Sequence, residues 1–316
     1  MNGHSVTPSP KDGPQRKAAG CQPAAGRGAR AQATVGETLR RARVALAAAL
    51  SLDPRGASLE AQMLLADSLG KGRAWLIAHD ADPVPVEALA RFEGLLARRL
   101  AGEPMAYLLG RREFFGLTLA VTPAVLIPRP ETEQLVELAL AHLPDGQPRQ
   151  VLDLGTGSGA VALAIAHARP AARVTAIERS RAALKVAREN ARRLGLTRVR
   201  FLQGDWFTPL EENERFHLIV ANPPYVAEDD PHLCRGDVRF EPRAALAAGV
   251  DGLAALRHIV AQAPRWLLPG GWLFLEHGWN QGEACRALLS AAGFGAVQTH
   301  RDLAGCERVS GGQKPG

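Results

Sequence analysis

The part of the chain after residue 130 alternates between short apolar runs and longer amphipathic stretches. The apolar runs have the length of strands, and apolar residues in the longer stretches recur at helical spacing. Strands are predicted at 150–154, 173–177, 199–203, 217–221 and 272–276, with further strands after residue 292, and helices at 131–143, 159–168, 180–194, 253–267 and 281–292. Because strands that alternate with helices form an open, mostly parallel sheet covered on both faces, the sequence predicts an α/β fold.

The chain before this region divides into three parts. Residues 1–33 contain no large aliphatic residue except Val6, which predicts a disordered extension. A transit peptide is the alternative, since the segment carries arginine and almost no acid. Residues 34–101 have helical periodicity and predict a small all-helical domain, whereas 102–130 predict a β-hairpin linker. The α/β domain is then expected over 131–310, followed by a flexible tail at 311–316.

Charge and cysteine content exclude several classes of protein. The net charge is +6 and the pI about 9.5, but residues 1–33 carry five basic residues and one acid, which leaves only +2 for the remainder. A protein that depends on phosphate contacts normally has a basic folded surface, so no stable nucleic-acid binding is expected. No apolar run is long enough to span a bilayer. The scattered cysteines predict free thiols in the cytoplasm and no metal site: Cys21, Cys234, Cys285 and Cys306.

The strand at 150–154 leads into the glycine-rich turn Gly155-Thr156-Gly157-Ser158-Gly159, and a helix follows. Such a turn lets the backbone approach a nucleotide closely, and its spacing also fits the dinucleotide fingerprint of NAD enzymes. Glu178, at the end of the second strand, can accept hydrogen bonds from a ribose and suits either ligand. Asp153 would repel a pyrophosphate but could help hold a cationic amino-acid tail. This acid favours S-adenosylmethionine over NAD.

Asn222-Pro223-Pro224-Tyr225 follows the strand at 217–221. The lone pair of a planar amide or aromatic amine is delocalised, so a methyl-transfer site must localise it. The Asn222 side-chain carbonyl can accept one N–H, and the Pro223 backbone carbonyl can accept the other. Pro224 stiffens the loop, and Tyr225 can stack on the flat group. The tetrapeptide therefore predicts methyl transfer to such a nitrogen.

Together these motifs resemble the amino methyltransferases, and specifically the bacterial protein-(glutamine-N5) methyltransferases of the PrmC or HemK family, which act on peptide-chain release factors. The resemblance extends over about residues 35–309. Glu178 stands where the family more often has Asp, and Cys306 and Glu307 are unusual for it. Further stretches that carry the resemblance lie at 102–107, 110, 113–116, 125–133, 204–207, 240–252 and 275–279.

The resemblance implies a Rossmann-like methyltransferase fold with a seven-stranded, mostly parallel sheet and a helical N-terminal domain that recognises the substrate. It implies methyl transfer from S-adenosyl-L-methionine to the side-chain nitrogen of the glutamine in the Gly-Gly-Gln motif of class one release factors. Asn222, Pro223 and Tyr225 would be catalytic, and together with Pro224 they would hold this glutamine. The residues expected to bind the cofactor are Gly155, Thr156, Gly157, Ser158, Gly159, Glu178, Trp206 and Asn222, with Trp206 beside the adenine.

Two other functions remain open at this stage. The same tetrapeptide can polarise the exocyclic amine of a flipped base, so an amino methyltransferase of nucleic acid is one alternative. A non-catalytic S-adenosylmethionine-binding adaptor on the ribosome is the other. The chain also contains its own Gly311-Gly312-Gln313, which we interpret as a coincidence in a polar tail.

Overall fold

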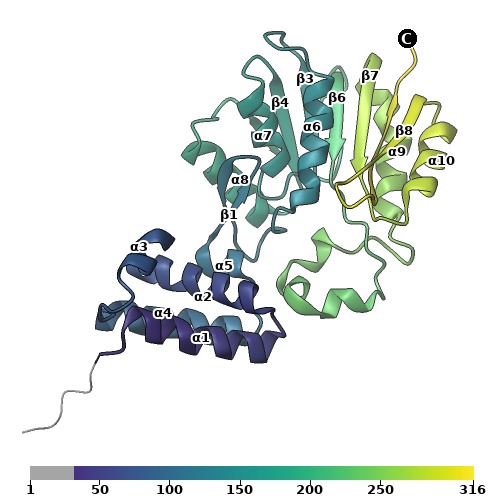
Figure 1. Ribbon diagram of the computed structural model, residues 1–316. Coiled ribbons are helices and arrows are strands. Elements are labelled where there is room, and N and C mark those ends of the chain that lie inside the picture. The colour runs from purple at the N-terminus through teal and green to yellow at the C-terminus, as the bar shows by residue number, and fades with distance from the viewer. Residues whose placement is uncertain (1–31) are drawn as a thin grey trace, which may run out of the picture.

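The computed structural model describes residues 32–316, and the prediction of disorder concerns residues that lie almost entirely outside this range. A helical unit and a larger α/β unit are joined by a β-hairpin (Figure 1). Within 32–316, no helix is both long and apolar enough to cross a membrane. The same residues contain no cluster of three His, Cys, Asp or Glu side chains that could hold a metal ion.

The helical unit owes its boundaries to local capping. Thr34 and Glu37 form a reciprocal capping box at the start of the first helix, and the Asp53 carboxylate accepts from two backbone N–H groups at the start of the second. The apolar faces of the helices then pack around Leu46, Leu64 and Phe92, which are fully buried. The helices are α1 (Val35–Leu50), α2 (Pro54–Leu69), α3 (Arg73–Ala78), α4 (Val86–Leu100) and α5 (Met105–Leu109).

A short hairpin connects the helical unit to the α/β unit. Strands β1 (Arg111–Phe114) and β2 (Leu117–Ala120) are antiparallel. The Asn190 side chain of the α/β unit accepts from the Ala120 N–H at 2.7 Å and donates to the Ala120 carbonyl at 3.0 Å. Phe114 is buried in the core of the α/β unit. The hairpin is thus fixed on the α/β unit by both hydrogen bonds and apolar packing.

The α/β unit contains a seven-stranded sheet within the described residues, in the order β5-β4-β3-β6-β7-β9-β8. All pairs are parallel except those of β9, which runs antiparallel to both of its neighbours. This mixed sheet confirms the predicted fold class. The strands are β3 (Gln150–Leu154), β4 (Arg173–Glu178), β5 (Arg200–Gln203), β6 (Phe216–Ala221), β7 (Leu267–Glu276), β8 (Gly295–Arg301) and β9 (Glu307–Gln313).

Helices cover both faces of this sheet (Figure 1). Successive strand residues point to opposite faces, so Val151 belongs to one apolar core and Leu152 to the other. The first core is closed by α6 (Glu133–Ala141), α7 (Ala160–Ala168) and α8 (Arg181–Arg193). The second is closed by α9 (Ala254–Trp266) and α10 (Gly282–Ala291). This two-sided burial explains why the strands are continuous apolar runs rather than alternating ones.

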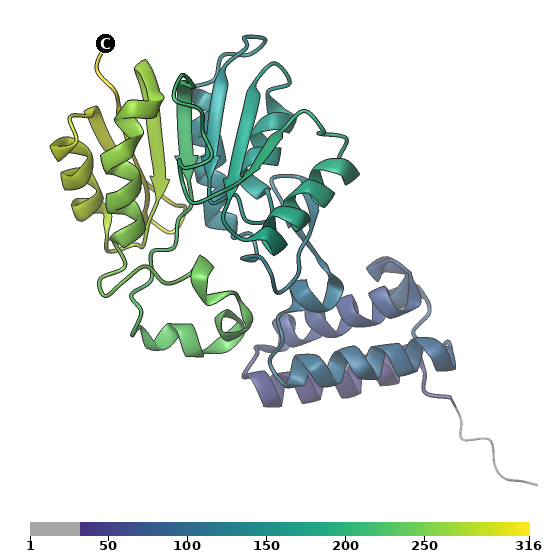
Figure 2. The same ribbon diagram turned by 180° about the vertical axis from the view of Figure 1, so that it is seen from behind.

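Segment 226–250 extends from the α/β unit to the helical unit, as both ribbon views show (Figures 1 and 2). The buried Arg99 guanidinium of α4 donates to the Asp237 carboxylate at 2.9 Å. Arg239 donates to the Ala101 carbonyl at 2.8 Å. These bonds connect the helical unit to a segment that borders a cavity of the α/β unit. The segment contains the 3₁₀ helices η2 (Pro231–Cys234), η3 (Gly236–Phe240) and η4 (Arg243–Ala245).

The predicted flexible tail at 311–316 is wrong for residues 311–313. These three residues form the end of β9 and pair with β7, and Gly311 and Gln313 also pair with β8. Gly311 and Gly312 are buried because their missing side chains let Phe274 and the Phe294 side chain approach the strand. Strands were expected after residue 292, but not the continuation of the last one through residue 313, because close backbone approach rather than an apolar side chain places this end in the sheet.

Candidate active site

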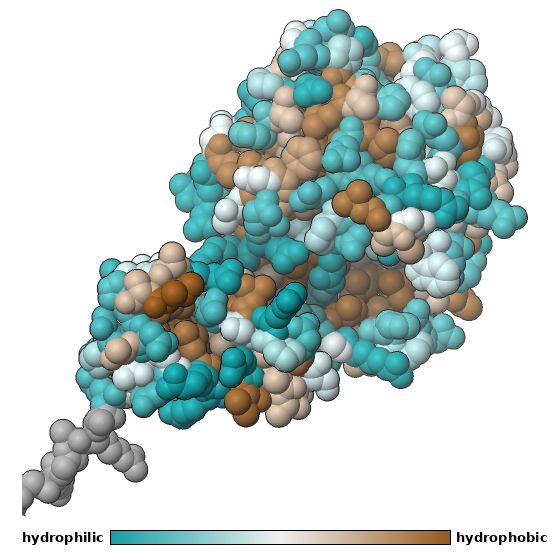
Figure 3. Space-filling view, viewed as in Figure 1, coloured by the Kyte–Doolittle hydropathy of each residue, from teal (hydrophilic) through white to brown (hydrophobic). Residues whose placement is uncertain are grey.

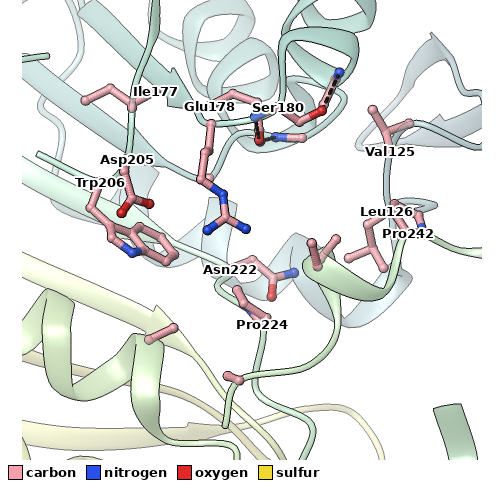
Figure 4. A pocket seen from close by; sticks show the side chains of 18 of the residues that line it. Val125, Leu126, Ile177, Glu178, Ser180, Asp205, Trp206, Asn222, Pro224 and Pro242 are labelled. Atoms are coloured by element: carbon pink, nitrogen blue, oxygen red, sulfur yellow. Dashed lines mark hydrogen bonds between the residues drawn. The ribbon is translucent and has the colours of Figure 1, made fainter. Parts of the chain in front are cut away.

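A cavity of about 480 Å³ opens at the carboxyl ends of β3, β4, β5 and β6. Ligands of open α/β sheets bind at this edge. In the space-filling view, a hollow with apolar walls lies between the α/β unit and segment 226–250 (Figure 3). Figure 4 shows the side chains that converge on the cavity from the ends of successive strands. The lining residues include Gly155, Gly157, Glu178, Asp205, Trp206 and Asn222.

The glycine-rich turn forms the floor of this cavity. Gly155 and Gly157 have φ angles of 71° and 56°, which other residues adopt at a cost. The N–H groups of Gly155 and Thr156 both donate to the Ile177 carbonyl, which ties the turn to the end of β4. A Cβ on Gly155 would lie 3.6 Å from the Trp206 ring, so a side chain there would occupy the cavity. The turn therefore keeps space free beside Trp206.

Glu178 is fixed where the sequence places it, at the end of β4. One carboxylate oxygen accepts from the Gly157 N–H at 2.9 Å, and the other accepts from the Ser180 N–H at 2.8 Å. Each carboxylate oxygen has a second lone pair, so the side chain can still accept from two neighbouring hydroxyl groups of a ligand. Its orientation is thus set before any ligand binds.

Trp206 and Asp205 form one wall of the cavity, where their side chains lie next to each other (Figure 4). Trp206 has a φ of 49°, an uncommon conformation that turns the ring toward Gly155. The ring offers a flat apolar surface, and the neighbouring Asp205 carboxylate offers acceptors. Such a wall suits a heteroaromatic base that carries an amino group.

A second, smaller cavity of about 50 Å³ adjoins the first and is lined by Thr156, Ser158 and Asp153. Asp153 is buried and accepts from the Thr156 hydroxyl at 2.6 Å. Burial, reinforced by the charge of Glu178, raises the pKa of Asp153 to about 7. No salt bridge to a cation of residues 32–316 compensates this carboxylate. A ligand cation placed here would stabilise its charged form.

Asn222 lines both cavities and therefore lies where they meet. Its Nδ2 donates to the Thr132 hydroxyl at 3.1 Å. Thr132 is buried at the end of the 3₁₀ helix η1 (Pro130–Thr132), which precedes α6. Because the amide nitrogen is engaged by Thr132, the Asn222 carbonyl oxygen is left to accept from a ligand.

The other predicted site residues have different environments. Pro224 lines the larger cavity, whereas Pro223, Tyr225 and Gly159 line neither. The Tyr225 hydroxyl lies 3.4 Å from a Glu276 carboxylate oxygen. Burial, together with the Glu276 charge, raises the pKa of Tyr225 far above its ordinary value, so the phenol remains a hydrogen-bond donor. Gly159 does not line either cavity, so its expected role in clearing space for the cofactor stays a prediction.

Gly159 instead has a structural role. Its φ is 87°, and a Cβ there would come within 3.0 Å of Leu163 and 3.3 Å of Ala187. It therefore permits a tight turn into α7 and close packing against α8. The sequence cue was a third glycine in the turn, and that cue does not distinguish a glycine facing a ligand from one facing a helix.

Sequence reasoning missed Thr132, Asp205 and Glu276. Asp205 directly precedes Trp206 at the end of a strand, so its position was a usable signal. Thr132 and Glu276 lie in the stretches 125–133 and 275–279 that carry the family resemblance, but nothing in the sequence linked them to Asn222, from which they lie 90 and 54 residues away. Only the fold brings η1 and the end of β7 beside the Asn222 loop.

Comparison with known proteins identifies the family. Residues 147–299 match the model of a methyltransferase domain, and residues 37–110 match that of the PrmC N-terminal domain. The release factor glutamine methyltransferase of Bordetella pertussis is 58% identical over 263 residues, which cover 83% of this chain and 97% of the relative. This chain belongs to the release factor glutamine methyltransferase family.

Other members of this family are similar to the chain over most of their length. The release factor glutamine methyltransferase of Burkholderia pseudomallei is 55% identical, with 82% of this chain and 93% of the relative covered. Among solved structures, the protein-(glutamine-N5) methyltransferase (release factor-specific) of Alicyclobacillus acidocaldarius is 32% identical, with a TM-score of 0.37. The match covers 63% of this chain and all of that one.

S-adenosylmethionine is the cofactor of this methyltransferase family, and the residues of the two cavities fit it. Glu178 offers acceptors for the ribose hydroxyls, and Trp206 offers a surface for the adenine ring. The carboxylate of Asp153 would face the cationic amino-acid tail in the smaller cavity. We therefore expect the cofactor to span both cavities, with its sulfonium near Asn222.

The raised pKa of Asp153 predicts a pH-dependent affinity for S-adenosylhomocysteine, which carries the same ammonium group. The ammonium favours the ionised form of the Asp153 carboxyl. Below pH 7 this carboxyl is mostly protonated in the free protein, so it must lose its proton when the ligand binds, and the affinity falls. We expect the Kd to be about tenfold higher at pH 6 than at pH 8. Calorimetry across this range should show a flatter profile for Asp153→Asn, and equal slopes in the two proteins would contradict the assignment.

Proposed function

We propose that this protein transfers the methyl group of S-adenosyl-L-methionine to the side-chain amide nitrogen of the glutamine in the Gly-Gly-Gln motif of class one release factors. The supporting observation is the orientation of Asn222, whose nitrogen is engaged by Thr132 at the junction of the two cavities. The carbonyl oxygen of Asn222 is thereby presented to a substrate amide. This activity would place the protein in translation termination and in the cytoplasm.

The proposed mechanism depends on two hydrogen-bond acceptors. Asn222 Oδ1 and the Pro223 backbone carbonyl would each accept one N–H of the substrate glutamine. These bonds concentrate the lone pair on nitrogen and direct it toward the methyl carbon. When bound, S-adenosylmethionine supplies this methyl group activated by a sulfonium. The amide nitrogen forms the new bond to carbon as the carbon–sulfur bond breaks, and it then loses a proton to water.

The remaining site residues would prepare this geometry. The glycine turn and Glu178 would hold the cofactor, and Trp206 would pack beside the adenine. Pro224 lines the larger cavity next to Asn222, where it would limit movement of the loop. Tyr225 is proposed to contact the substrate amide through its ring, while its hydroxyl faces Glu276. The helical unit is proposed to recognise the body of the release factor.

The function can be tested with purified components. We expect the protein, incubated with S-adenosylmethionine and an unmethylated release factor, to add 14 Da, the mass that one methyl group adds, to the tryptic peptide with Gly-Gly-Gln. Fragment-ion mass spectra should assign this methyl to the glutamine. A release factor with this glutamine changed to alanine is the matched control. Cofactor binding without methylation of the unmethylated factor would contradict the proposal and favour a nucleic-acid substrate or an adaptor.

A further inference from the structure

Trp279 is an exposed aromatic side chain that the mechanism above does not use. Its exposed fraction is 66%, whereas the other four tryptophans of the chain are buried or half-buried. Its ring stacks on no aromatic ring and faces no cation of residues 32–316. Burial of so large a ring would stabilise the fold, so packing within the chain does not explain why it faces water.

The backbone that carries Trp279 is held in one conformation. Residues 278–281 form a β-turn after β7, closed by a hydrogen bond of 2.9 Å from the Gln281 N–H to the Gly278 carbonyl. The Gly278 N–H donates to the Gln281 side-chain oxygen at 2.9 Å, and Nδ1 of the buried His277 donates to the Gly278 carbonyl at 2.8 Å. Both polar groups of the Gly278 backbone are thus bonded, so the indole projects from a rigid turn.

This arrangement gives the buried His277 a structural role. Because the Gly278 carbonyl can only accept, the hydrogen of the neutral ring lies on Nδ1. Nε2, at 2.8 Å from the Ser310 oxygen of β9, is then left to accept from the Ser310 hydroxyl. Burial lowers the pKa of His277, which keeps the ring neutral and preserves this pattern of one donor and one acceptor. The ring therefore anchors the turn to the sheet.

The turn that carries Trp279 packs against the loop of the proposed catalytic residues. Gln281 Nε2 donates to the Tyr225 carbonyl at 3.0 Å. Pro224, the residue before Tyr225, lines the larger cavity. Trp279 itself lines neither cavity, so it lies outside the expected cofactor site and on a turn bonded to the loop that begins at Asn222.

A second exposed apolar side chain belongs to another segment that meets this loop. Gly252 approaches it so closely that a Cβ there would lie 2.3 Å from the Tyr225 carbonyl oxygen and 2.9 Å from Gln281 Nε2. Val250, two residues earlier, is 84% exposed. The segments that carry Trp279 and Val250 therefore meet at one carbonyl of the catalytic loop.

The target glutamine of the proposed reaction belongs to a protein, and this determines what must lie beside the site. Its side chain can reach Asn222 only if the loop that carries it lies on the enzyme surface around the cavity. Trp279 projects from the turn next to this position on a fixed backbone. Exposed tryptophans that lose little conformational freedom on binding make the largest contributions to protein–protein interfaces.

We propose that Trp279 is a substrate-binding residue, whose indole packs against an apolar part of the release-factor loop that carries the target glutamine. This inference rests on the proposed function, because it names the enzyme surface that the same protein substrate covers. Trp279 touches neither the cofactor nor the reacting atoms. Its loss is therefore expected to weaken binding of the release factor without slowing methyl transfer in the bound complex.

Steady-state kinetics of Trp279→Ala with an unmethylated release factor test this separation. We expect the KM for the release factor to rise by about 10- to 50-fold, as when an aromatic anchor is removed from an interface. The kcat and the Kd for S-adenosylhomocysteine should change by less than about threefold, because the lost contact is the same in the ground state and the transition state. Trp279→Phe keeps a flat apolar ring and should hold the KM within about fivefold of the parent.

Leu303→Ala is the matched control. Leu303 is fully exposed in the turn between β8 and β9, two strands away from β7 in the sheet, so it removes apolar surface away from the catalytic loop. Its KM should stay within about twofold of the parent. Equal increases of the KM in Leu303→Ala and Trp279→Ala would overturn the assignment, because they would show a general loss of apolar surface rather than a specific contact.

A measurement on the parent protein does not depend on how a variant folds. Hydroxyl-radical oxidation can be compared with and without a saturating release factor, in the presence of S-adenosylhomocysteine to prevent turnover. Fragment-ion mass spectra assign the oxidation to single residues. We expect oxidation of Trp279 to fall by about threefold or more on binding, because a buried anchor is shielded from water, and that of Leu303 to stay unchanged. Unchanged oxidation of Trp279 would overturn the inference.

The outcomes separate this inference from the proposed function. A parent enzyme that does not methylate an unmethylated release factor would refute the function and, with it, the inference. An active parent whose Trp279→Ala variant keeps the parental KM would overturn the inference alone. A variant with a parental KM but a kcat lowered more than tenfold would also overturn it, because Trp279 would then act on the chemical step.

Discussion

Replacing Asn222 by alanine is expected to slow methyl transfer to the release factor by about 10²- to 10³-fold, the usual effect of removing one preorganised hydrogen-bonding group from an active site. The variant removes the acceptor for one substrate N–H, so the amide lone pair is no longer localised or aimed. Thr132 would also lose its donor. Single-turnover methylation, followed by mass spectrometry of the Gly-Gly-Gln peptide, measures the rate without a contribution from product release.

Cofactor binding distinguishes a chemical defect from a damaged site. S-adenosylhomocysteine should bind Asn222→Ala within about tenfold of the parent, because Glu178, Trp206 and Asp153 remain. Asn213→Ala makes the same change at an exposed turn and should have no effect on rate. A variant that binds the cofactor normally and methylates at the parental rate would remove Asn222 from the mechanism.

The parts of the fold that could be predicted from the sequence are those determined by residues close to each other along the chain. The strand predicted at 150–154 has these bounds in the structure, because its apolar run ends where the glycine turn must begin. The alternation of strands and helices predicted that helices cover both faces of the sheet, and it predicted the edge of the sheet at which the cavity lies. Glu178 was found for the same reason, since it directly follows a predicted strand and strand ends meet at one edge of the sheet. Trp206, which also lines the cavity, was expected from the family resemblance.

The parts that were missed depend on contacts between distant segments. The stretch 275–279 around Glu276 carries the family resemblance, but it does not show what the Glu276 side chain faces. The hydrogen-bond donor to Glu276 is Tyr225, which lies 51 residues away in the sequence. Tyr225 was found as a residue, but the direction of its hydroxyl could not be predicted, because the buried partner that attracts it lies on another strand.

The end of the last strand, at residues 311–313, was missed for a different physical reason. Strand prediction relies on side chains that favour the pleated sheet, and two consecutive glycines provide none. In the folded chain, the position of Gly311 has no room for a Cβ atom. Phe274 of the paired strand β7 occupies that space and itself packs against Trp272 and His142.

Gly311→Val therefore tests the structural interpretation of this strand. β-propensity alone predicts stabilisation by up to about 1 kcal/mol, since valine favours strands. The structure predicts the opposite, because a Cβ at this position would lie 2.2 Å from the Phe274 ring and 2.9 Å from the Leu273 carbonyl oxygen. Phe274 is fully buried and cannot swing away. We expect a loss of about 3 kcal/mol or more.

Thermal unfolding measures this loss directly, and a destabilisation of about 3 kcal/mol corresponds to a fall in Tm of roughly 6–12 °C for a unit of this size. Gly316→Val, in the same terminal segment with nothing within 4 Å of its Cβ position, should leave Tm unchanged. The sign of the change in Tm caused by Gly311→Val decides between a paired strand and a flexible tail. A flexible tail would make the two valines equivalent, whereas a paired strand makes Gly311→Val alone destabilising, because only there must the sheet separate to admit a side chain.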